Sequence, residues 1–532
     1  MNLETKQCKN CKQNFTIEPE DFEFYDKIKV PAPTFCPECR LQRKMVRRNE
    51  RTLYKRKCDY CHKDTISMYP QNSSYKIYCN ECWWSDNWDP FSYGRDYDFN
   101  RPFFEQFQNL SLSAPRLSLY QKNAVSSPFT NHCEHLKNCY LTFDTGFSEE
   151  VNYSKWVIKS KDLSDCYGAF SSELGYEIQD SENCSRSKYL FYSNNCFDST
   201  FLYSCKGCSN CFLSSNLRNQ QYYFKNKKFS KEEYQKKIIE IDLGNYKIIQ
   251  ETKKQFIEEI LPKTLRRFSK FNKVVDSTGD DLYECKGLKK SFHVYESEDS
   301  AFCVDAANLK DCYDAYEPAF NCERQYDCHA CNRVSNSMFT SISYDNHHLQ
   351  LCEMCHGSNN LFGCIGLRNK QYCILNKQYT KEEYEQLVPK IIEHMNSIPY
   401  VDKKGRVYKY GEFFPPELSP FAYNETIAQE YFPLTKEQAL EQGYSWKEPE
   451  ERNIQITVKS EDLPDHIKDV NDDILNKVIE CQHNNQNCNE QCTTAFKIIP
   501  QELEFYRKMN LPLPRLCPNC RHYQRIKQRN PL

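Results

Sequence analysis

The sequence predicts a mainly β, multidomain chain in which cysteine-rich modules at both ends flank two related β-solenoid-like segments, each followed by a helix. Three observations lead to this prediction. The 532 residues exceed what one hydrophobic core usually organises, so several domains are expected. Cysteines recur in closely spaced pairs near both ends of the chain. Two long stretches also reappear elsewhere in the same sequence, which indicates duplicated structural units.

The two ends of the chain carry the first repeat. "CKQNFTIEPEDFEFYDKIKVPAPTFCPECR" (Cys11 to Arg40) aligns without a gap to "CTTAFKIIPQELEFYRKMNLPLPRLCPNCR" (Cys492 to Arg521). The cysteines, Glu-Phe-Tyr, Pro-x-Pro and Cys-Pro-x-Cys-Arg coincide. We therefore expect one fold at both termini.

Paired cysteines predict zinc sites in these modules and in a second module beside the first. Two knuckles that each present two thiolates form a closed tetrahedral site of the zinc-ribbon or treble-clef type, with no open position for a catalytic water. Such sites are structural. The predicted ligands are Cys8, Cys11, Cys36 and Cys39 in the first site, Cys58, Cys61, Cys79 and Cys82 in the second, and Cys488, Cys492, Cys517 and Cys520 in the third.

A further candidate set lies in the middle of the chain, at Cys328, Cys331, Cys352 and Cys355. Here thiols also recur as interior positions of the repeats, which is the alternative reading. The prediction is therefore about three zinc ions per chain, or four if this set also binds metal.

The middle of the chain carries the second repeat. "CFLSSNLRNQQYYFKNKKFSKEEY" (Cys211 to Tyr234) reappears as "LFGCIGLRNKQYCILNKQYTKEEY" (Leu361 to Tyr384). Each copy ends in a capping box, Ser-x-x-Glu or Thr-x-x-Glu, which satisfies free backbone donors and starts a helix. Short cues such as "LSDCYGA" and "LKDCYDA" precede the helices at irregular intervals. A β-solenoid with an internal ladder of small or thiol side chains fits them, and a string of antiparallel hairpins is the alternative.

Basic residues follow the last cysteine pair of both end modules. They recur at three- and four-residue steps, so a helix would place them on one face. Arginine-rich helices suit phosphate backbones, and we predict RNA or DNA contacts. Two alternatives are a solvated helix face and docking on the chain's own acidic segment 412–480. The predicted contacts are Arg40, Arg43, Lys44, Arg47, Arg48, Arg51, Arg521, Arg525 and Arg529.

Six regions follow from these patterns. An aromatic stretch from Trp83 to Phe107 is predicted to fix the N-terminal modules to the first solenoid-like segment. The regions are a zinc ribbon with a basic helix (1–57), a second ribbon with the aromatic linker (58–110), a solenoid-like segment with helices (111–270), a second such segment with a helix (271–400), an acidic linker (401–480) and a C-terminal ribbon (481–532).

Composition limits the functional class. The N-terminus is polar, no apolar stretch approaches membrane-spanning length, and the cysteines suit metal ligation in a reducing compartment, so we expect a cytoplasmic protein without a membrane partner. Common nucleotide-binding and hydrolase motifs do not occur. We therefore expect no enzyme activity.

Four further segments are distinctive: "FEFYDKIKVPAPTFCPECRLQRKMVRRNE", "CWWSDNWDPFSYGRDYDFNRPFFEQF", "YGEFFPPELSPFAYNETIAQEYFP" and "FYRKMNLPLPRLCPNCR". Together they resemble an uncharacterised family of bacterial zinc-ribbon proteins of treble-clef type with a cysteine-rich repeat middle. The resemblance implies zinc ligation and brings no catalytic residue.

Three functional hypotheses follow. The first is a non-catalytic zinc protein that binds nucleic acid, with structured RNA favoured, through the basic helices. The second is a protein-interaction scaffold built on the solenoid. The third is a β-helix enzyme acting on carbohydrate, which would need two convergent carboxylates.

Overall fold

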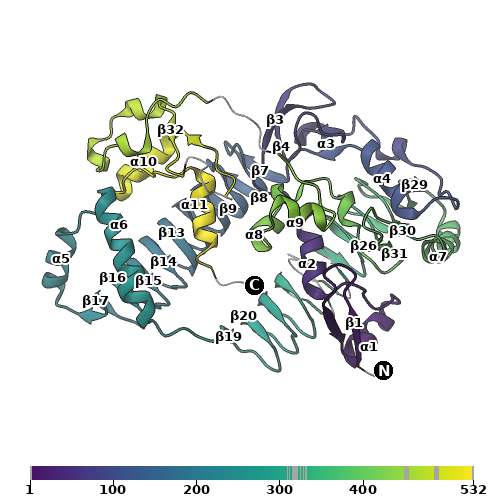
Figure 1. The fold of residues 1–532 in the computed structure, drawn as a ribbon, viewed down its shortest axis with the longest axis horizontal. Helices are drawn as coiled ribbons and strands as arrows, with labels where there is room; N and C mark the ends of the chain where they lie inside the picture. The colour runs from purple at the N-terminus through teal and green to yellow at the C-terminus, as the bar shows by residue number, and fades with distance from the viewer. Residues whose placement is uncertain are drawn as a thin grey trace. The chain divides into compact units, whose positions relative to one another are not determined.

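The computed structural model describes residues 3–529, apart from 308, 311, 314–321, 324, 328, 330–331, 449–453 and 484–489. The chain divides into two compact units. Unit 1 contains Met1–Ser118 and Arg267–Glu448, and unit 2 contains Leu119–Arg266 and Pro449–Pro531. Each unit combines a terminal cysteine module with a long array of parallel strands (Figure 1). The protein is thus mainly β with several sheets, as predicted.

Unit 2 is built on a parallel array that we call stack 1, residues 119–228. Its strands pair in parallel with a register shift of twelve residues, for example Ser185 beside Glu173. The pairing follows chain order except that β10 pairs with β12 and β11 pairs with β9 and β13. The last pair, β17 with β18, is an antiparallel hairpin. The strands are β7 (Gln121–Val125), β8 (Asn131–Lys137), β9 (Phe143–Asn152), β10 (Lys155–Ile158), β11 (Lys161–Ser164), β12 (Tyr167–Phe170), β13 (Glu173–Glu182), β14 (Ser185–Phe191), β15 (Thr200–Tyr203), β16 (Ser209–Ser215), β17 (Gln221–Phe224) and β18 (Lys227–Lys228).

Unit 1 holds a second array, stack 2, residues 271–378, which ends in the same kind of antiparallel hairpin. Its described strands form three sheets, within 271–307, 309–323 and 332–378. The twelve-residue register recurs, for example between Asn359 and His347, whereas Phe271 pairs with Leu282 at an offset of eleven and Leu309 with Cys322 at an offset of thirteen. The strands are β19 (Phe271–Asn272), β20 (Gly279–Tyr283), β21 (Ser291–Tyr295), β22 (Val304–Ala307), β23 (Leu309–Lys310), β24 (Cys322–Glu323), β25 (Asn332–Ser335), β26 (Tyr344–Gln350), β27 (Asn359–Phe362), β28 (Gln371–Ile374) and β29 (Lys377–Gln378).

A left-handed corner at every third residue produces these arrays. In stack 1 the backbone φ is positive at every third position from Asn123 to Lys225, which gives four corners per twelve-residue turn. The residue after each corner points inward, so small and medium side chains such as Cys139, Val151 and Leu163 form one buried column. A left-handed corner costs a non-glycine residue roughly 1–2 kcal/mol. Cross-turn hydrogen bonds at each level must offset this cost.

Inward-pointing serines supply hydrogen-bond acceptors for backbone N–H groups of the next turn. The hydroxyl of Ser172 accepts the Cys184 N–H at 3.1 Å and donates to the Phe170 carbonyl at 2.9 Å. Ser160 does the same for the Ser172 N–H, at 3.1 Å. An inward hydroxyl thus satisfies a buried donor of the next turn, which would cost free energy if left unpaired. This is why serine alternates with cysteine and aliphatic residues inside both stacks.

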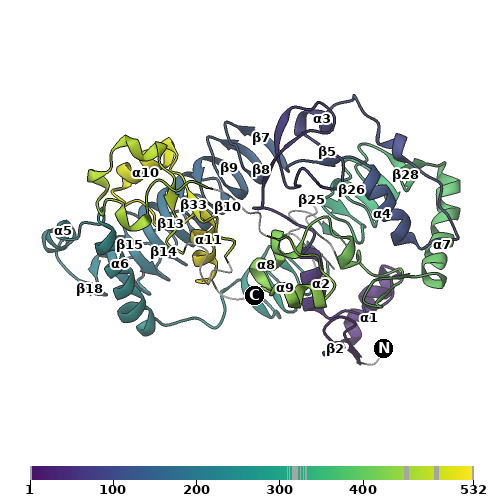
Figure 2. The same cartoon turned by 45° about the horizontal axis from the view of Figure 1, so that its top comes forward.

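Helices cover the ends and one side of each stack. The predicted capping boxes are confirmed: Ser230 Oγ accepts the Glu233 N–H at 3.2 Å, and Thr380 Oγ1 accepts the Glu383 N–H at 3.2 Å. Figure 2 shows α7 beside β28. The helices of these segments are α5 (Lys231–Ile239), α6 (Tyr246–Gln255) with its π-turn (Phe256–Ile260), and α7 (Lys381–Ser397).

The three cysteine modules share a hairpin followed by a helix. The N-terminal module has β1 (Glu4–Gln7), β2 (Asn14–Ile17), α1 (Pro19–Lys27) and α2 (Pro37–Met45). The second module has β3 (Tyr54–Lys57), β4 (Asp64–Ser67), β5 (Ile77–Tyr78) and α3 (Asn80–Trp84), and it is followed by α4 (Phe103–Ser113) and β6 (Arg116–Leu117). The C-terminal module has β32 (Ile479–Glu480), β33 (Ala495–Phe496), α10 (Pro500–Met509) and α11 (Pro518–Ile526).

The region predicted to be an acidic linker is folded where it is described. Its first part contributes β30 (Tyr400–Val401), β31 (Val407–Tyr408), α8 (Ala428–Tyr431) and α9 (Lys436–Glu441) to unit 1. Tyr423, Ile427 and Ala439 pack there against Met45 and Val46 at the end of α2. In unit 2, Leu463, Ile467 and Val470 join the hydrophobic core. Buried apolar residues between the charges therefore make this region part of both units.

The aromatic stretch packs on a different partner from the one predicted. Trp83 and Trp84 contact His356, at ring-centroid distances of 5.7 Å and 5.0 Å, and Phe103 meets Phe362 at 5.4 Å. These contacts lie on stack 2 within unit 1, whereas the sequence analysis assigned the stretch to the first solenoid-like segment. The prediction that this stretch packs a small module against a strand array is confirmed. The array is stack 2 and not the first solenoid-like segment.

Candidate metal centres and the basic helices

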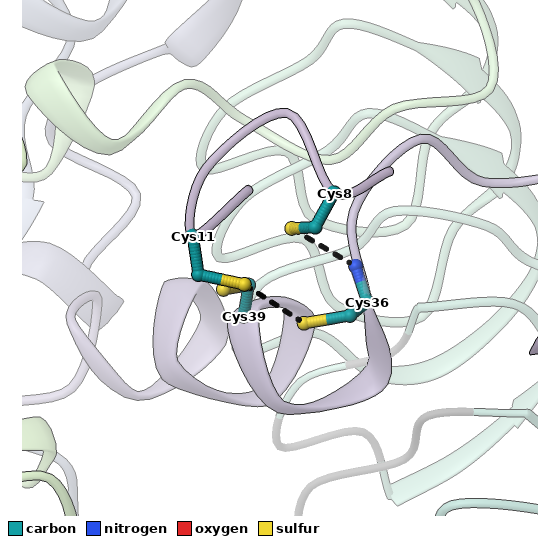
Figure 3. Close-up of side chains that lie close together, drawn as sticks. All are labelled: Cys8, Cys11, Cys36 and Cys39. Atoms are coloured by element: carbon teal, nitrogen blue, oxygen red, sulfur yellow. Dashed lines mark hydrogen bonds between the residues drawn. The ribbon is translucent and has the colours of Figure 1, made fainter. Parts of the chain in front are cut away.

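The N-terminal module brings its four predicted cysteines together (Figure 3). Cys8 follows β1, Cys36 is the N-cap of α2, and Cys39 lies in the first turn of that helix. The Cys11 and Cys36 Sγ atoms are 3.7 Å apart, and the Cys36 N–H donates to Cys8 Sγ at 3.3 Å. Four sulfurs at about 2.3 Å from one zinc ion would stand about 3.8 Å apart. The arrangement fits a tetrahedral thiolate site.

The second module repeats this geometry with its predicted cysteines, Cys58, Cys61, Cys79 and Cys82. Cys61 Sγ and Cys79 Sγ are 3.9 Å apart, and the Cys79 N–H donates to Cys58 Sγ at 3.2 Å. Cys79 is again an N-cap, here of α3. The helix N-terminus places its positive end near the thiolates, which stabilises their negative charge.

The C-terminal cluster contains Cys481 together with Cys492, Cys517 and Cys520. The Sγ–Sγ distances are 3.9 Å between Cys481 and Cys520 and 4.0 Å between Cys492 and Cys517. Cys488, the ligand predicted from the sequence, lies outside the described residues. Three of the four predicted ligands are therefore in the cluster, and Cys481 takes the remaining position.

Backbone geometry shows that Cys481 is the counterpart of Cys8 and Cys58. Each follows the first strand of its hairpin, and each donates its N–H to a carbonyl of the returning strand or turn, at 2.8 Å, 2.8 Å and 2.9 Å. Each also accepts the N–H of the cysteine that caps the following helix, at 3.2 Å for Cys481. The signal in the sequence is the strand-like "VIEC", which parallels "TKQC" and "KRKC". A ten-residue loop before Cys492, in place of the usual two residues, obscured it.

The further candidate set does not form a described cluster. Cys328 and Cys331 lie outside the described residues. Cys352 and Cys355 are fully buried in the interior of stack 2 and pack with Leu349, Leu361 and Cys364. Their thiols donate to the carbonyls two residues before them, at 3.2 Å and 3.4 Å. These two cysteines are interior ladder positions, the alternative that the sequence analysis left open.

The basic helix of the N-terminal module is buried in unit 1. Arg40, Arg43, Lys44, Arg47 and Arg48 are at most 4% exposed. Arg43 pairs with Asp327 at 2.7 Å and with Glu412 at 3.0 Å, and Lys44 pairs with Asp327 at 2.6 Å. Arg47 pairs with Glu353 and Arg48 with Glu50. Burial alone would raise the pKa of Asp327, but Lys44 and Arg43 outweigh it and hold that pKa below its ordinary value.

The basic helix of the C-terminal module is buried in unit 2 in the same way. Arg521 and Arg525 both pair with Asp165, each at 2.6 Å, and Arg521 also lies 3.3 Å from Glu502. Arg525 donates to the Tyr153 carbonyl at 2.9 Å. Burial raises the pKa of Glu502, although Arg521 and the hydroxyls of Tyr153 and Tyr506 oppose that rise. In Figure 1, α11 lies along the strands of stack 1 in this unit.

The two dockings are equivalent. Asp165 and Asp327 both occupy left-handed corners, and in the sequence each precedes a cysteine. The end-to-end alignment pairs Lys44, on Asp327, with Arg525, on Asp165. The aligned Phe-Tyr pairs also match, because Tyr25 meets Tyr326 at 5.1 Å and Tyr506 meets Tyr176 at 6.1 Å. Sequence reasoning missed both aspartates, although the recurring Asp-Cys pair was visible.

The predicted phosphate contacts need correction at these positions. Arg40, Arg43, Lys44, Arg47, Arg48, Arg521 and Arg525 are buried and held by carboxylates or carbonyls of their own unit, so they present no face to a phosphate backbone. The helical spacing holds for Arg40, Arg43 and Lys44 on α2 and for Arg521 and Arg525 on α11, where it marks a buried ionic interface rather than a solvent face. Arg47, Arg48 and Arg51 lie beyond the end of α2, and Arg529 lies beyond the end of α11. Arg51 and Arg529 are partly exposed, and Arg529 donates to the Tyr167 hydroxyl at 3.0 Å.

Comparison with known proteins adds little. No protein-family model and no curated protein matches the chain. Seven solved chains match, among them a crystal structure named for a proposed acetyltransferase of Desulfovibrio desulfuricans G20. The match has 8% identity and a TM-score of 0.10, and it covers 55% of this chain and 86% of that one. A similarity this low carries no argument. In the described part of the chain, no helix combines the length and apolar character needed to cross a membrane.

The assignment of Cys481 leads to a direct prediction. Replacing Cys481 with serine should remove one bound metal ion per chain, because it takes away a ligand of the C-terminal cluster. Replacing Cys488 with serine should leave that ion in place. Elemental analysis of the purified variants after desalting measures the difference. Loss of the ion from the Cys488 variant, with retention in the Cys481 variant, would contradict the assignment.

Proposed function

We propose that the chain is a non-catalytic, zinc-dependent binding scaffold. In this proposal, structural zinc ions order the three modules, the two stacks are β-solenoids, and the outer faces of the solenoids bind a protein partner. A closed set of four thiolates leaves zinc no open position for a substrate, which supports a structural role. The twelve-residue parallel register and the regular left-handed corners support the solenoid reading.

The alternating positive and negative side chains on the outer faces of the stacks favour a protein over a nucleic acid as the partner. On stack 1 Glu149 lies 2.6 Å from Lys137 and 3.6 Å from Lys161, so the signs alternate from turn to turn. Arg186 and Asp198 pair across one turn at 2.7 Å, and Arg333 and Asp345 pair on stack 2. A polyanion is attracted by one sign of charge, whereas mixed exposed pairs suit the polar surface of another protein.

Purification without nuclease tests the proposal. We expect bound zinc, a ratio of absorbance at 260 to 280 nm without a nucleic-acid contribution, and a protein partner that stays bound after added nuclease. Charge reversal at Lys161 and Arg333 should weaken capture of that partner, whereas reversal at Lys227 and Lys228, on the hairpin strand β18, should not. Co-purified nucleic acid that salt releases, with no protein partner, would overturn the scaffold proposal.

One observation favours nucleic acid as a second candidate partner. The segment from Lys263 to Lys273, "KTLRRFSKFNK", contains five basic residues and no acid. Within it the Phe268 side chain is fully exposed, at 102%, and Leu265 is 80% exposed. Exposed aromatics between cations can stack on unpaired bases while the cations contact phosphates. In this second candidate, the nucleic-acid site is the segment from Lys263 to Lys273 rather than the basic helices of the zinc modules.

Salt dependence distinguishes the two candidates. If the segment binds single-stranded nucleic acid, affinity for a labelled oligonucleotide should fall steeply as salt rises. Charge reversal at Arg266 and Arg267, or Phe268→Ala, should abolish that binding, and reversal at Lys227 and Lys228 should preserve it. Binding that is unchanged by salt and by these substitutions would exclude the segment.

A further inference from the structure

The C-terminal cluster has a second group of metal-binding side chains beside it. His483, Glu490 and Cys520 place a ring nitrogen, a carboxylate oxygen and a thiol sulfur within 4.8 Å of one another. Cys520 is also a ligand of the third cluster, so its sulfur is common to both groups. We propose that these three residues hold a second divalent transition-metal ion of the zinc class, bridged through Cys520 to the ion of the third cluster.

The distance between the two non-sulfur donors supports a metal ion rather than a direct ion pair. His483 Nδ1 and Glu490 Oε2 are 3.4 Å apart. A charge-assisted hydrogen bond between them would be about 2.7–2.9 Å long. Nitrogen and oxygen at about 2.0–2.1 Å from one tetrahedral zinc ion would stand about 3.4 Å apart. The two side chains therefore have the spacing of two ligands around a common ion.

Hydrogen bonds hold the backbone next to both donors. The Gln482 N–H donates to the Arg515 carbonyl at 2.9 Å, which fixes the residue before His483. Asn519 Nδ2 donates to the Gln491 carbonyl at 2.9 Å, which fixes the residue after Glu490. The two donors are therefore flanked by backbone that is hydrogen-bonded to α11 and to the loop that precedes it. The long loop before Cys492, which the other two modules lack, supplies both donors.

Charge balance also favours a second cation. Four thiolates around one divalent ion leave two negative charges, and Glu490, which is 7% exposed, adds a third. Arg521 and Arg525, on the same helix as Cys520, are already paired with Asp165. Lys527 pairs with Oε1 of Glu490, whereas His483 Nδ1 lies next to Oε2 of the same carboxylate. Such a partner orients a metal-bound carboxylate.

The donor set indicates the ion. Imidazole, carboxylate and thiolate together suit zinc rather than calcium or magnesium, which prefer oxygen ligands. The described residues supply three of the four donors that a tetrahedral zinc ion takes. Among the described residues, the clusters of the N-terminal and second modules have no grouped histidine or carboxylate of this kind. They serve as internal controls for a site with a single ion.

Metal content of the full-length protein tests the inference. After zinc loading and desalting, we expect four zinc ions per chain in the wild type and three in His483→Ala and Glu490→Gln. His62→Ala, which removes a histidine next to the second cluster, should keep four. His483→Cys, which restores a donor, should also keep four. Circular dichroism of each variant shows whether it is folded. The two test variants remove different donors, so if His483→Ala misfolds, Glu490→Gln is compared with the wild type alone.

Cadmium-113 NMR of the metal-exchanged protein provides the second measurement. A shared Cys520 thiolate should produce spin coupling between two cadmium signals, and Glu490→Gln should abolish both the coupling and one signal. The inference rests on the proposed metal ion in the third cluster. A wild-type protein with two ions would show that the third cluster is empty, which contradicts the proposed function as well. Three ions without spin coupling would contradict only the second site proposed here. Four ions in every variant would show that the fourth is bound elsewhere and would also overturn it.

Discussion

Asparagine in place of Asp165 is expected to destabilise unit 2 by about 3–5 kcal/mol, because it leaves two buried guanidinium groups without a counter-charge. Asp165 is fully buried and accepts hydrogen bonds from Arg521 and Arg525, each at 2.6 Å. Asparagine keeps the size of the side chain and tolerates the left-handed corner, so the loss is electrostatic. Chemical denaturation of the full chain, with hydrogen exchange at α11 as a local readout, measures the effect.

Asp162 provides a matched control three residues earlier. It also occupies a left-handed corner and also pairs with a cation of the C-terminal module, Lys508, at 3.1 Å. That pair is partly exposed, with side-chain exposures of 22% for Asp162 and 50% for Lys508. An exposed ion pair contributes at most about 1 kcal/mol, so Asp162→Asn should change little.

A compensated variant separates charge from packing. If unpaired charge causes the loss, then replacing Arg521 and Arg525 with methionine and Glu502 with glutamine in the Asp165→Asn background should restore much of the stability, because no charge of this ion-pair group is then left buried without a partner. Equal stability of the Asp165→Asn and wild-type proteins would show that the ion pairs do not hold the helix. The position of α11 on stack 1 would then depend on its apolar contacts alone.

Most residues of the cysteine clusters could be predicted because their signal is local. In the modules each Cys-x-x-Cys pair forms one knuckle, and the capping boxes at Ser230 and Thr380 are equally local. The same spacing at Cys352 and Cys355 marks interior positions of stack 2, so spacing alone did not separate the two kinds of cysteine pair. The exception, Cys481, shows the limit of that reasoning. Its knuckle contains ten residues instead of two, so the nearer Cys488 matched the expected spacing better.

The regular period of the stacks was hidden because no single residue type marks it. Inward positions accept serine, cysteine, valine and leucine, as in the column Cys139, Val151, Leu163 and Ser187. Corner positions accept residues as different as His135, Phe147 and Lys159. Only the backbone conformation repeats regularly, so the sequence showed irregular cues where stack 1 has a constant turn of twelve residues.

The sequence left the fate of the basic helices undecided, although Arg43 does pair with Glu412 in the acidic segment that was one of the alternatives. A helix with arginine on one face looks the same whether that face meets water, phosphate or a carboxylate. The residue that decides it, Asp165, is 356 positions from Arg521. Its partner in the other unit, Asp327, is likewise remote from Arg43. Contacts this distant in sequence follow from the tertiary fold and not from local pattern.

Metal removal is the second prediction with a large effect. Chelation, or Cys517→Ser, should unfold the C-terminal module and release α11 from stack 1, because the ion links the hairpin to the helix that carries Arg521 and Arg525. A structural zinc ion supplies about 10 kcal/mol or more of folding free energy. Cys36→Ser should have the same effect on the N-terminal module. Hydrogen exchange read by mass spectrometry should show α11 losing protection while β13 to β15 keep theirs.

Cys211→Ser is the matched control, since it makes the same chemical change at a buried cysteine inside stack 1. Serine suits that column, because Ser199 occupies the equivalent position one turn earlier and its hydroxyl accepts the Cys211 N–H at 3.1 Å. The Cys211 variant should therefore keep its metal and the protection of α11. If α11 stayed protected after chelation, the buried ion pairs alone would hold the helix. Loss of protection in the strands as well would instead show that the stack depends on the module that covers it.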